Sequence, residues 1–362
     1  MKLFVLLLLS CFHLSFSSST YNAIFNFGDS ISDTGNLLLS GGASKVFPGI
    51  ASLPYGSTFF GRPTGRCSDG RLIIDFIAEA FGLPFLPPIL TQNQSFVHGA
   101  NFAVAGATAL DASFFEQRGF VGLTNYTLNL QLQWFEQLIP SLCHTTEDCR
   151  AYLSKSLFFV GEIGGNDYIH PTMAGLSFEE VQTYVPFVVE TISNAVERLI
   201  NLGAVNLVVP GTPSVGCMGQ ILTMAVGNDD GDDYETETGC LKKANNVMKQ
   251  HNDLLRHEVA KLRRKHPHVN IIYADLYQPV IQFFRSPSYY GFKSNPLRAC
   301  CGGGGPYNFD FKVRCGEPGS SVCGDPSSSL DWDGDHLTET AYHQVAQFWL
   351  KGLNANLRND MK

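Results

Sequence analysis

The residue types that could do chemistry in this chain lie near its two ends. Gly28-Asp29-Ser30 directly follows a short apolar run, and Asp333-x-x-His336 comes shortly before the C-terminus. A serine hydroxyl is a poor nucleophile until a base takes its proton, so Ser30 needs a partner. In the Asp-x-x-His spacing, a turn can bring the carboxylate onto one imidazole nitrogen while the other nitrogen faces the serine. We therefore predict a catalytic triad of Ser30, His336 and Asp333 that attacks carbonyl groups.

Acyl transfer also needs hydrogen-bond donors for the oxyanion of its tetrahedral intermediate. Gly106 follows the second predicted strand and could offer a backbone N–H where a side chain would block the substrate. Asn166 follows the third predicted strand and could offer its side-chain amide, and the N–H of Ser30 would be the third donor. We expect Asp335, which is adjacent to His336, to point elsewhere.

Each of these pieces also has an ordinary structural interpretation. Gly-Asp-Ser is common in turns, Gly106 could serve a turn, and Asn166 could form an Asx-turn. Asp333 and His336 could be an N-cap and a surface histidine before the last helix. The order of the four pieces favours chemistry, because each follows a predicted strand or precedes the last helix. The remaining histidines lack a nearby partner motif and are given no role: His98, His144, His170, His251, His257, His266, His268 and His343.

The elements that must position these residues alternate between strand and helix. Apolar runs predict strands at 23–27, 101–105, 157–160, 205–209 and 269–273, and helical spacing predicts helices at 71–82, 178–202, 241–265 and 338–353. Buried strands separated by helices indicate a parallel sheet covered on both faces. In such sheets the chemistry lies beyond the carboxyl ends of the strands. Residues 20–362 are therefore predicted to form a single α/β domain.

The N-terminus predicts export. Lys2 precedes the apolar run 3–9, and small residues follow at 15–19, which is the pattern of a cleavable secretory signal at residues 1–19. The apolar run is shorter than the roughly 20 residues that span a bilayer. The net charge of -8 and the pI of 5.7 argue against a nucleic-acid or anionic-membrane partner. We expect a secreted protein, in the extracellular space, the cell wall or the vacuole.

Two further patterns fit an oxidising compartment. Asn93 and Asn125 each begin an acceptor sequon and are predicted glycosylation sites. The chain has 10 cysteines, and loss of Cys11 with the signal leaves nine. None forms the paired ribbons of a zinc site, so disulfides are expected.

The spacing of the cysteines allows two pairs to be predicted. Cys143 and Cys149 bracket a short polar loop, and Cys217 and Cys240 bracket a longer acidic one, so we predict a bridge within each pair. Because nine is odd, at least one thiol stays free or pairs between chains, and Cys67 is the expected free thiol. The pairing of the others is left open: Cys300, Cys301, Cys315 and Cys323.

The acidic run 229–233 could suggest calcium, but it lacks the ligand pattern of an EF-hand and is predicted to be a solvated loop tip, so no metal is expected.

Four segments resemble the signature blocks of the GDSL esterase/lipases, the SGNH hydrolases: Gly28-Asp29-Ser30, Gly106, Gly164-Gly165-Asn166-Asp167 and Asp333-x-x-His336. The similarity covers nearly the whole mature chain. Segments 63–71 and 300–302 are similar to the plant branch of this family, within it to the subgroup of sinapine esterase and acetylajmalan esterase. The sequence departs from many relatives at Leu337, where they have proline.

This resemblance implies a flavodoxin-like three-layer sandwich with a central five-stranded parallel sheet. It implies Ser30 as nucleophile, Gly106 and Asn166 as oxyanion donors beside the N–H of Ser30, and Asp333 with His336 as the supporting pair. It also implies that no metal or cofactor takes part.

The function expected from the sequence is a secreted serine esterase that forms an acyl-serine intermediate. The subgroup resemblance points to acetyl or aromatic acyl esters of small metabolites or glycans as substrates. An acyltransferase that passes the acyl group to an alcohol is one alternative, and sequence does not separate the two. A catalytically inactive secreted binding glycoprotein is another, and the intact set of catalytic residues speaks against it.

Overall fold

The computed structural model describes residues 21–226 and 233–360. The predicted signal at 1–19 and all but the last residue of the acidic run 229–233 lie outside the described residues.

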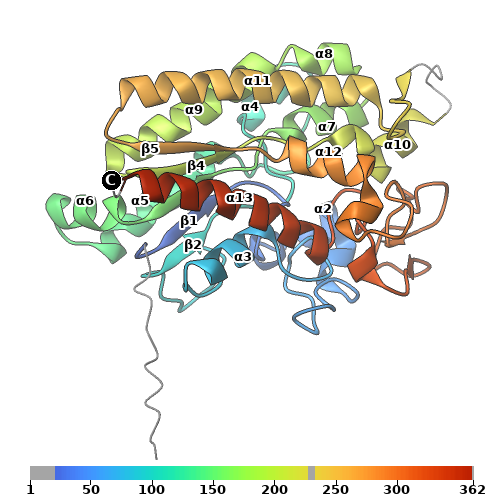
Figure 1. Cartoon of the computed structure of the whole chain (residues 1–362), viewed down its shortest axis with the longest axis horizontal. Coiled ribbons are helices and arrows are strands. Elements are labelled where there is room, and N and C mark those ends of the chain that lie inside the picture. Colours follow the sequence, from blue (N-terminus) through green and yellow to red (C-terminus); the bar gives the residue numbers. More distant parts are fainter. Residues whose placement is uncertain (1–20, 227–232, 361–362) are drawn as a thin grey trace, which may run out of the picture.

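A five-stranded sheet forms the centre of the molecule (Figure 1). Its strands are β1 (Ile24–Phe27), β2 (Gly99–Asn101), β3 (Leu157–Val160), β4 (Asn206–Pro210) and β5 (Asn270–Ala274). Every neighbouring pair is parallel, and the strand order is β2-β1-β3-β4-β5. This is the flavodoxin-like order, so the predicted fold class is confirmed.

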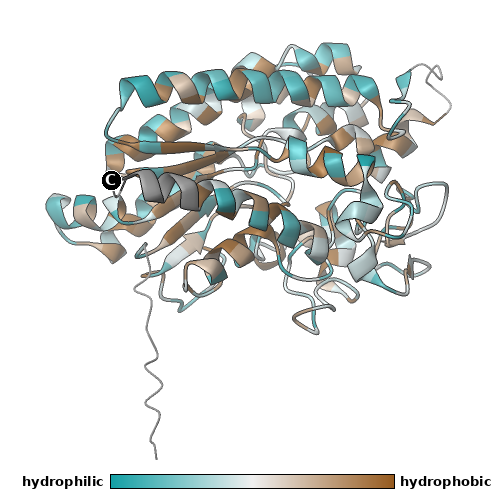
Figure 2. Cartoon of the chain, in the orientation of Figure 1, coloured by the Kyte–Doolittle hydropathy of each residue, from teal (hydrophilic) through white to brown (hydrophobic). Residues whose placement is uncertain are grey.

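Helices cover both faces of the sheet. One layer contains α5 (Leu128–Leu142), α9 (Val185–Leu202) and α11 (Lys242–Lys265), and the other contains α3 (Ile73–Ala80) and α13 (Glu339–Asp360). Figure 2 shows apolar residues along the strands and polar residues on the outer face of α11. Burial of the strands from both sides explains why they read as continuous apolar runs and do not alternate.

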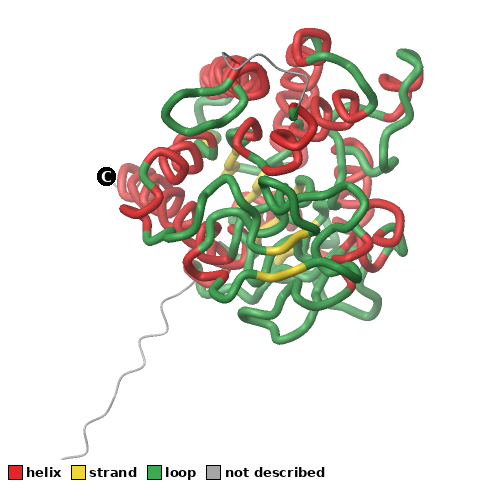
Figure 3. Tube along the Cα trace, turned by 90° about the vertical axis from the view of Figure 1, so that its right-hand side faces the viewer, coloured by secondary structure: helices red, strands yellow, loops and turns green. Residues whose placement is uncertain are grey.

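The remaining elements are short. They are α1 (Asn36–Leu39), α2 (Ala43–Val46), α4 (Ala112–Glu116), α6 (Thr146–Ser154), α7 (Gly165–Met173), α8 (Phe178–Gln182), α10 (Gly219–Ala225), α12 (Tyr277–Arg285) and an antiparallel pair, β6 (Cys301–Gly302) and β7 (Ser321–Val322). Figure 3 looks onto the end of the sheet where long loops gather.

An aromatic cluster fixes the strand that leads to Ser30. The ring of Phe27 stacks on that of Phe102 with their centroids 5.0 Å apart, and Phe25 lies 5.1 Å from Phe135 of α5. All four side chains are fully buried. Replacing one such ring by alanine costs about 3–5 kcal/mol in a typical core, so β1 has little freedom to shift.

Two predicted elements were placed wrongly. The strand predicted at 101–105 ends at Asn101, because the side chain of Asn101 accepts the N–H of Ala103 at 2.9 Å and donates to the carbonyl of Ser32 at 2.6 Å. Phe102 and Val104 still donate to the carbonyls of Asn26 and Gly28, at 2.7 and 3.2 Å, so the chain continues beside β1 after the regular strand ends. The helix predicted at 178–202 is two helices, α8 and α9, with Pro186 in the first turn of the second.

Among the residues that the structure describes, four disulfides hold the loops. The structure bridges Cys143 with Cys149 and Cys217 with Cys240, the two pairs expected from the spacing. It also pairs the cysteines that the sequence left open, as Cys300–Cys323 and Cys301–Cys315. Cys67 is a free thiol and is buried. Across the described residues, no helix is both long enough and apolar enough to cross a membrane.

Peptide mapping without reduction should recover all four of these disulfide linkages. Cys67 should react with an alkylating reagent only after denaturation, because its side chain is fully buried. A linked Cys67, or alkylated Cys143 or Cys217 in the unreduced protein, would contradict the pairing.

Candidate active site

The turn after β1 places Ser30 at the carboxyl edge of the sheet. Gly28 has a φ of +153°, and a Cβ there would lie 2.5 Å from Oγ of Ser32 and 2.9 Å from the carbonyl oxygen of Glu162. Only glycine fits this close approach. Gln131 of α5 holds the same residue, because its amide accepts the Gly28 N–H at 2.9 Å and donates to the Gly28 carbonyl at 2.8 Å.

The carboxylate of Asp33 joins the loop after β1 to the loop after β2. It accepts the N–H groups of Gly35 at 2.7 Å, Asn36 at 2.6 Å, Leu37 at 3.0 Å and Ala105 at 2.9 Å. Burial raises the pKa of Asp33, and these four backbone bonds act in the opposite direction by favouring the ionised form. The bond to Ala105 ties the residue before Gly106 to the loop that carries Ser30.

Gly106 occupies a tight position in that second loop. Its φ is +81°, and an added Cβ would lie 3.1 Å from Thr124 and 3.2 Å from Val46. The N–H groups on either side are both used inside the protein, that of Ala105 by Asp33 and that of Ala107 by the carbonyl of Val104 at 2.9 Å. The predicted oxyanion donor is therefore an amide in a backbone conformation that disfavours other residues.

Asn166, the second residue of α7, reaches back to both of these loops. Its Nδ2 donates to Oδ2 of Asp29 at 3.2 Å and to the carbonyl of Ala107 at 3.0 Å. The next residue, Asp167, accepts the N–H groups of Ala109 at 2.8 Å and Leu110 at 2.9 Å, and burial raises its pKa to about 7. The start of α7 is thus fixed to the loop after β2.

Asp333 and His336 form a buried hydrogen-bonded pair. The imidazole Nδ1 lies 3.0 Å from Oδ1 and 2.9 Å from Oδ2 of Asp333. Oδ1 also accepts the backbone N–H groups of Asp335 at 3.0 Å and His336 at 2.9 Å, and Oδ2 accepts the hydroxyl of Tyr55 at 2.7 Å. Because the carboxylate is surrounded by donors, Nδ1 carries the proton of a neutral imidazole and Nε2 is left as the base.

The electrostatics of the pair favour its charged form. Burial by itself lowers the pKa of His336, but the Asp333 carboxylate hydrogen-bonded to Nδ1 outweighs it and holds that pKa well above its usual value. Burial by itself raises the pKa of Asp333, but His336 and the hydroxyl of Tyr55 bring it below its usual value. Asp333 is therefore ionised and stabilises an imidazolium.

Backbone bonds close the turn that carries this pair. The N–H of Gly334 donates to Oδ1 of Asp331 at 2.7 Å, and the N–H of Trp332 donates to the carbonyl of His336 at 2.7 Å. The N–H groups of Cys300 and Cys301 donate to the carbonyls of Asp331 and Trp332, at 2.9 and 2.7 Å. The two disulfides of the C-terminal region therefore support the turn that positions His336.

The plant-like segment 63–71 packs beneath the same turn. Ser68 donates to the carbonyl of Leu337 at 3.0 Å, and Asp69 accepts the N–H of Glu339 at 2.7 Å. Arg71 pairs with the Glu339 carboxylate at 2.9 Å. In the sequence, this segment was notable only for its resemblance to the plant branch. Its distance from His336 along the chain gave no sign that the two segments are in contact. Leu337, the departure from proline, uses its N–H, which donates to the hydroxyl of Tyr342 at 3.3 Å.

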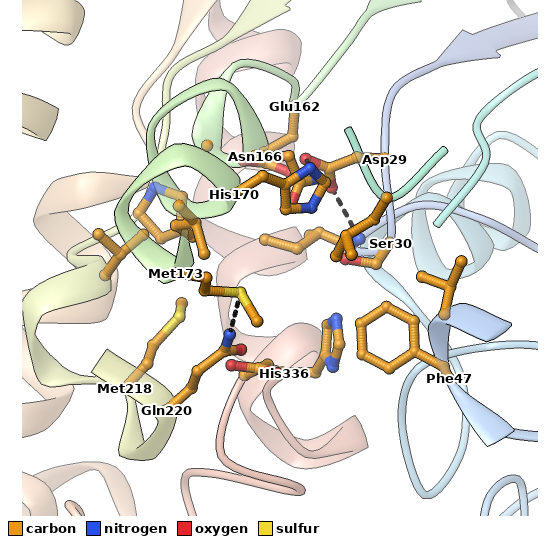
Figure 4. A pocket seen from close by; sticks show the side chains of 18 of the residues that line it. Asp29, Ser30, Phe47, Glu162, Asn166, His170, Met173, Met218, Gln220 and His336 are labelled. Atoms are coloured by element: carbon orange, nitrogen blue, oxygen red, sulfur yellow. Dashed lines mark hydrogen bonds between the residues drawn. The ribbon is translucent and has the colours of Figure 1, made fainter. Parts of the chain in front are cut away.

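Ser30, Asn166 and His336 line one pocket, and Figure 4 shows their side chains around the same space. Asp29 and Glu162 line its inner side. The cavity has a volume of about 60 Å³. Its apolar lining consists of Ile31, Val46, Phe47, Leu123, Ile169, Met173, Pro213, Val215 and Met218.

Besides Asp29 of the Gly-Asp-Ser motif, five polar residues of this pocket were given no role by sequence reasoning: Glu162, His170, Gln220, Arg314 and Asp335. His170 was given no role, but it lines the pocket, and burial lowers its pKa to about 4. Glu162 was not considered. As expected, the imidazole is held by Asp333 and not by Asp335, but Asp335 also lines the pocket, where burial raises its pKa to about 7. Glu162, His170 and Asp335 could have been noticed in the sequence because each is titratable and lies close to a predicted catalytic residue.

The other predicted sites lie away from the pocket. Asn93 and Asn125 are exposed, as glycosylation requires. Among the residues that the structure describes, no group of three or more His, Cys, Asp or Glu side chains is arranged to hold a metal ion.

Comparison with known proteins places this geometry in a family. The family model described as GDSL-like lipase/acylhydrolase matches residues 24–349. A GDSL esterase/lipase of Arabidopsis thaliana is 53% identical over 340 residues, which cover 92% of this chain and 91% of that protein. Sinapine esterase of Brassica napus is 47% identical over 339 residues, covering 93% and 87%. A second Arabidopsis GDSL esterase/lipase is 45% identical over 361 residues, covering 97% and 92%. The chain therefore belongs to the GDSL lipase/acylhydrolase family and is a carboxylic ester hydrolase.

Proposed function

We propose that this protein is a secreted serine esterase that hydrolyses acetyl or aromatic acyl esters of small metabolites or glycans through an acyl-serine intermediate. The observation that carries the proposal is the Asp333–His336 pair, with Nδ1 within 3.0 Å of both carboxylate oxygens and the imidazole in the pocket of Ser30. A carboxylate that fixes one imidazole nitrogen prepares the other to accept a serine proton.

In the first half of the reaction, Oγ of Ser30 attacks the ester carbonyl carbon while Nε2 of His336 takes its proton. The ionised Asp333 stabilises the imidazolium that forms. When the tetrahedral intermediate collapses, the bond to the alkoxy oxygen breaks, and His336 returns the proton to the departing alcohol. The acyl group is then esterified to Ser30.

In the second half, water takes the place of the alcohol. His336 accepts a proton from the water as its oxygen attacks the acyl carbon, and it then protonates Oγ of Ser30 as the acid departs. One ester and one water yield one acid and one alcohol, and the enzyme is regenerated.

The oxyanion of both intermediates needs donors on one side of the carbonyl. The N–H groups of Ser30 and Gly106 and the amide of Asn166 come from three neighbouring loops at the carboxyl edge of β1, β2 and β3. Asn166 Nδ2 already faces the pocket, and its 3.2 Å bond to Asp29 is long enough to be exchanged for a stronger one to an oxyanion.

The pocket and one relative support the substrate class. The pocket is lined largely by apolar side chains beside Ser30, Asn166 and His336, which suits the acyl part of an ester. Sinapine esterase is named for a small-molecule ester. Export is supported by the predicted signal and by four disulfides, which persist in oxidising compartments.

Ser30→Ala should abolish hydrolysis of acetyl and hydroxycinnamoyl esters and labelling by a fluorophosphonate, because the attacking oxygen is gone. The matched control is Ser141→Ala on the exposed surface of α5, which should keep both activity and labelling. Thermal unfolding should show both variants folded. Labelling that persists on another serine in Ser30→Ala would refute the assignment.

Asn166→Ala should lower kcat by about 10²–10³-fold with a much smaller change in KM, since the lost hydrogen bond strengthens in the transition state. Steady-state kinetics with an acetyl ester test this, with the exposed Asn201→Ala as control. A raised KM with unchanged kcat would instead make Asn166 a substrate-binding residue.

The pH profile should report the Asp333–His336 pair. Because His336 must be neutral to act as base and its pKa is raised, kcat/KM should rise with pH through a limb centred above the unperturbed value of about 6.5. Asp333→Asn removes the carboxylate that raises this pKa, so its limb should move to lower pH and kcat should fall by up to about 10⁴-fold. The exposed Asp253→Asn on α11 is the control. Near-normal activity of Asp333→Asn with an unmoved limb would exclude Asp333 as the orienting carboxylate.

A further inference from the structure

The carboxylate of Asp29 links three parts of the site. Its Oδ1 accepts the N–H of Ile31 at 3.1 Å, and its Oδ2 accepts Nδ2 of Asn166 at 3.2 Å. Its own N–H donates to the carbonyl of Glu162 at 3.2 Å. Asp29 thus connects the residue that follows Ser30, the amide that faces the oxyanion position, and the loop after β3. It is 3% exposed.

Glu162 is the next carboxyl group in this arrangement. It lies two residues after β3, is 5% exposed, and lines the pocket beside Asp29 (Figure 4). Its Oε2 is fully buried, and no hydrogen-bond donor among the described residues reaches it. Its backbone carbonyl accepts the N–H of Asp29, and the carboxyl groups of the two residues line the same pocket. Two buried carboxyl groups this close repel each other when both are ionised, which favours a proton on one of them.

The surroundings decide which of the two carries it. Asp29 receives the bonds from Ile31 and Asn166, which favour its ionised form. Glu162 has only the neighbouring carboxylate, so burial and Asp29 together raise its pKa well above the usual range. Burial raises the pKa of Asp29 to about 6.

Several other charged or titratable groups face this pair. His336 comes from the C-terminal turn, Asp33 from the loop after β1, Asp167 from α7, and Tyr342 from α13. Only His336 favours ionisation of the pair, and the anions oppose it. These surroundings favour the protonated form of Glu162.

We propose that protonated Glu162 is a positioning residue of the oxyanion site, which acts through Asp29 to hold the amide of Asn166. The Glu162 hydroxyl donates to Asp29 and replaces the hydrogen bond that Asp29 gives up when Asn166 turns to the oxyanion. Its proton also keeps a second negative charge away from the place where the oxyanion develops, where a like charge would oppose it. Glu162 touches no reacting atom.

A double-mutant cycle separates this role from general support of the fold. Glu162→Leu should lower kcat by roughly 10–100-fold with KM nearly unchanged, the size of effect that a small misplacement of a catalytic group produces. In an Asn166→Ala background the same change should cost less than about threefold, because the residue that Glu162 positions is already absent. Equal losses in both backgrounds would overturn the proposal.

Glu162→Gln provides the second test, since it keeps a neutral donor in nearly the same volume. It should restore kcat to within about threefold of the unmodified enzyme, because the amide replaces the carboxylic acid. It should also remove or raise the alkaline limb of kcat, because glutamine has no proton to lose at high pH. A Glu162→Gln enzyme as weak as Glu162→Leu, or one with an unchanged alkaline limb, would contradict the role.

Two controls keep these results interpretable. Glu190→Gln, an exposed change on α9, should leave kcat and the pH profile unaltered. If thermal unfolding shows that Glu162→Leu is not folded, the alkaline limb of the kcat–pH profile of Glu162→Gln decides the question alone. The role of Glu162 rests on the proposed acyl-serine mechanism, so activity in Ser30→Ala would defeat both. If Ser30→Ala is inactive but Glu162→Leu lowers kcat equally with and without Asn166→Ala, the acyl-serine mechanism stands and only the role of Glu162 is excluded.

Discussion

The carboxylate of Asp33 receives four backbone N–H groups, three from its own turn and one from Ala105 in the loop after β2. Parallel strands deliver their carboxyl ends to one edge of the sheet, but the loops beyond them have no sheet partners. Each buried N–H left without an acceptor would cost about 1–3 kcal/mol. Asp33 satisfies four at once, and Asp167 does the same for two more after β2. The relative positions of Ser30, Gly106 and Asn166 depend on these two acceptors.

Carboxyl groups at this edge have opposite protonation because their surroundings differ. Asp333 accepts from two backbone N–H groups, a tyrosine hydroxyl and an imidazole, and its pKa falls below the usual value. Glu162 faces another carboxyl group, and its pKa rises well above the usual value. In the proposed reaction, Asp333 stabilises the imidazolium of His336. Protonated Glu162 adds no negative charge near the oxyanion. Burial alone would raise both pKa values, so the hydrogen-bond partners decide the outcome.

Much of this arrangement could be predicted from local sequence. The apolar runs that became β1 and β3 are buried on both faces, and the glycines at 28 and 106 lie where the backbone requires them. The second strand was misplaced because the side chain of Asn101 competes with the sheet for backbone bonds, which hydrophobic pattern does not reveal.

What the sequence could not show are contacts between distant segments. Cys67 reaches His336 across about three quarters of the chain, and Tyr55 reaches Asp333 across 278 residues. Glu162 is a single acidic residue after Gly161 in the sequence, and only the fold shows that it is buried beside Asp29, so that burial and Asp29 together raise its pKa. The spacing of Asp335 in the sequence also gave no sign that this residue lines the pocket.

The central claim is that the loops after β1, β2 and β3 form one oxyanion site around an acyl-serine. The most direct measurement is a crystal structure of the enzyme after reaction with a phosphonate ester, whose tetrahedral adduct mimics the intermediate. The account predicts phosphorus bonded to Oγ of Ser30, with one phosphonyl oxygen about 2.7–3.1 Å from the N–H groups of Ser30 and Gly106 and from Nδ2 of Asn166. An adduct whose oxygens face away from these three donors, or one formed on another residue, would contradict it.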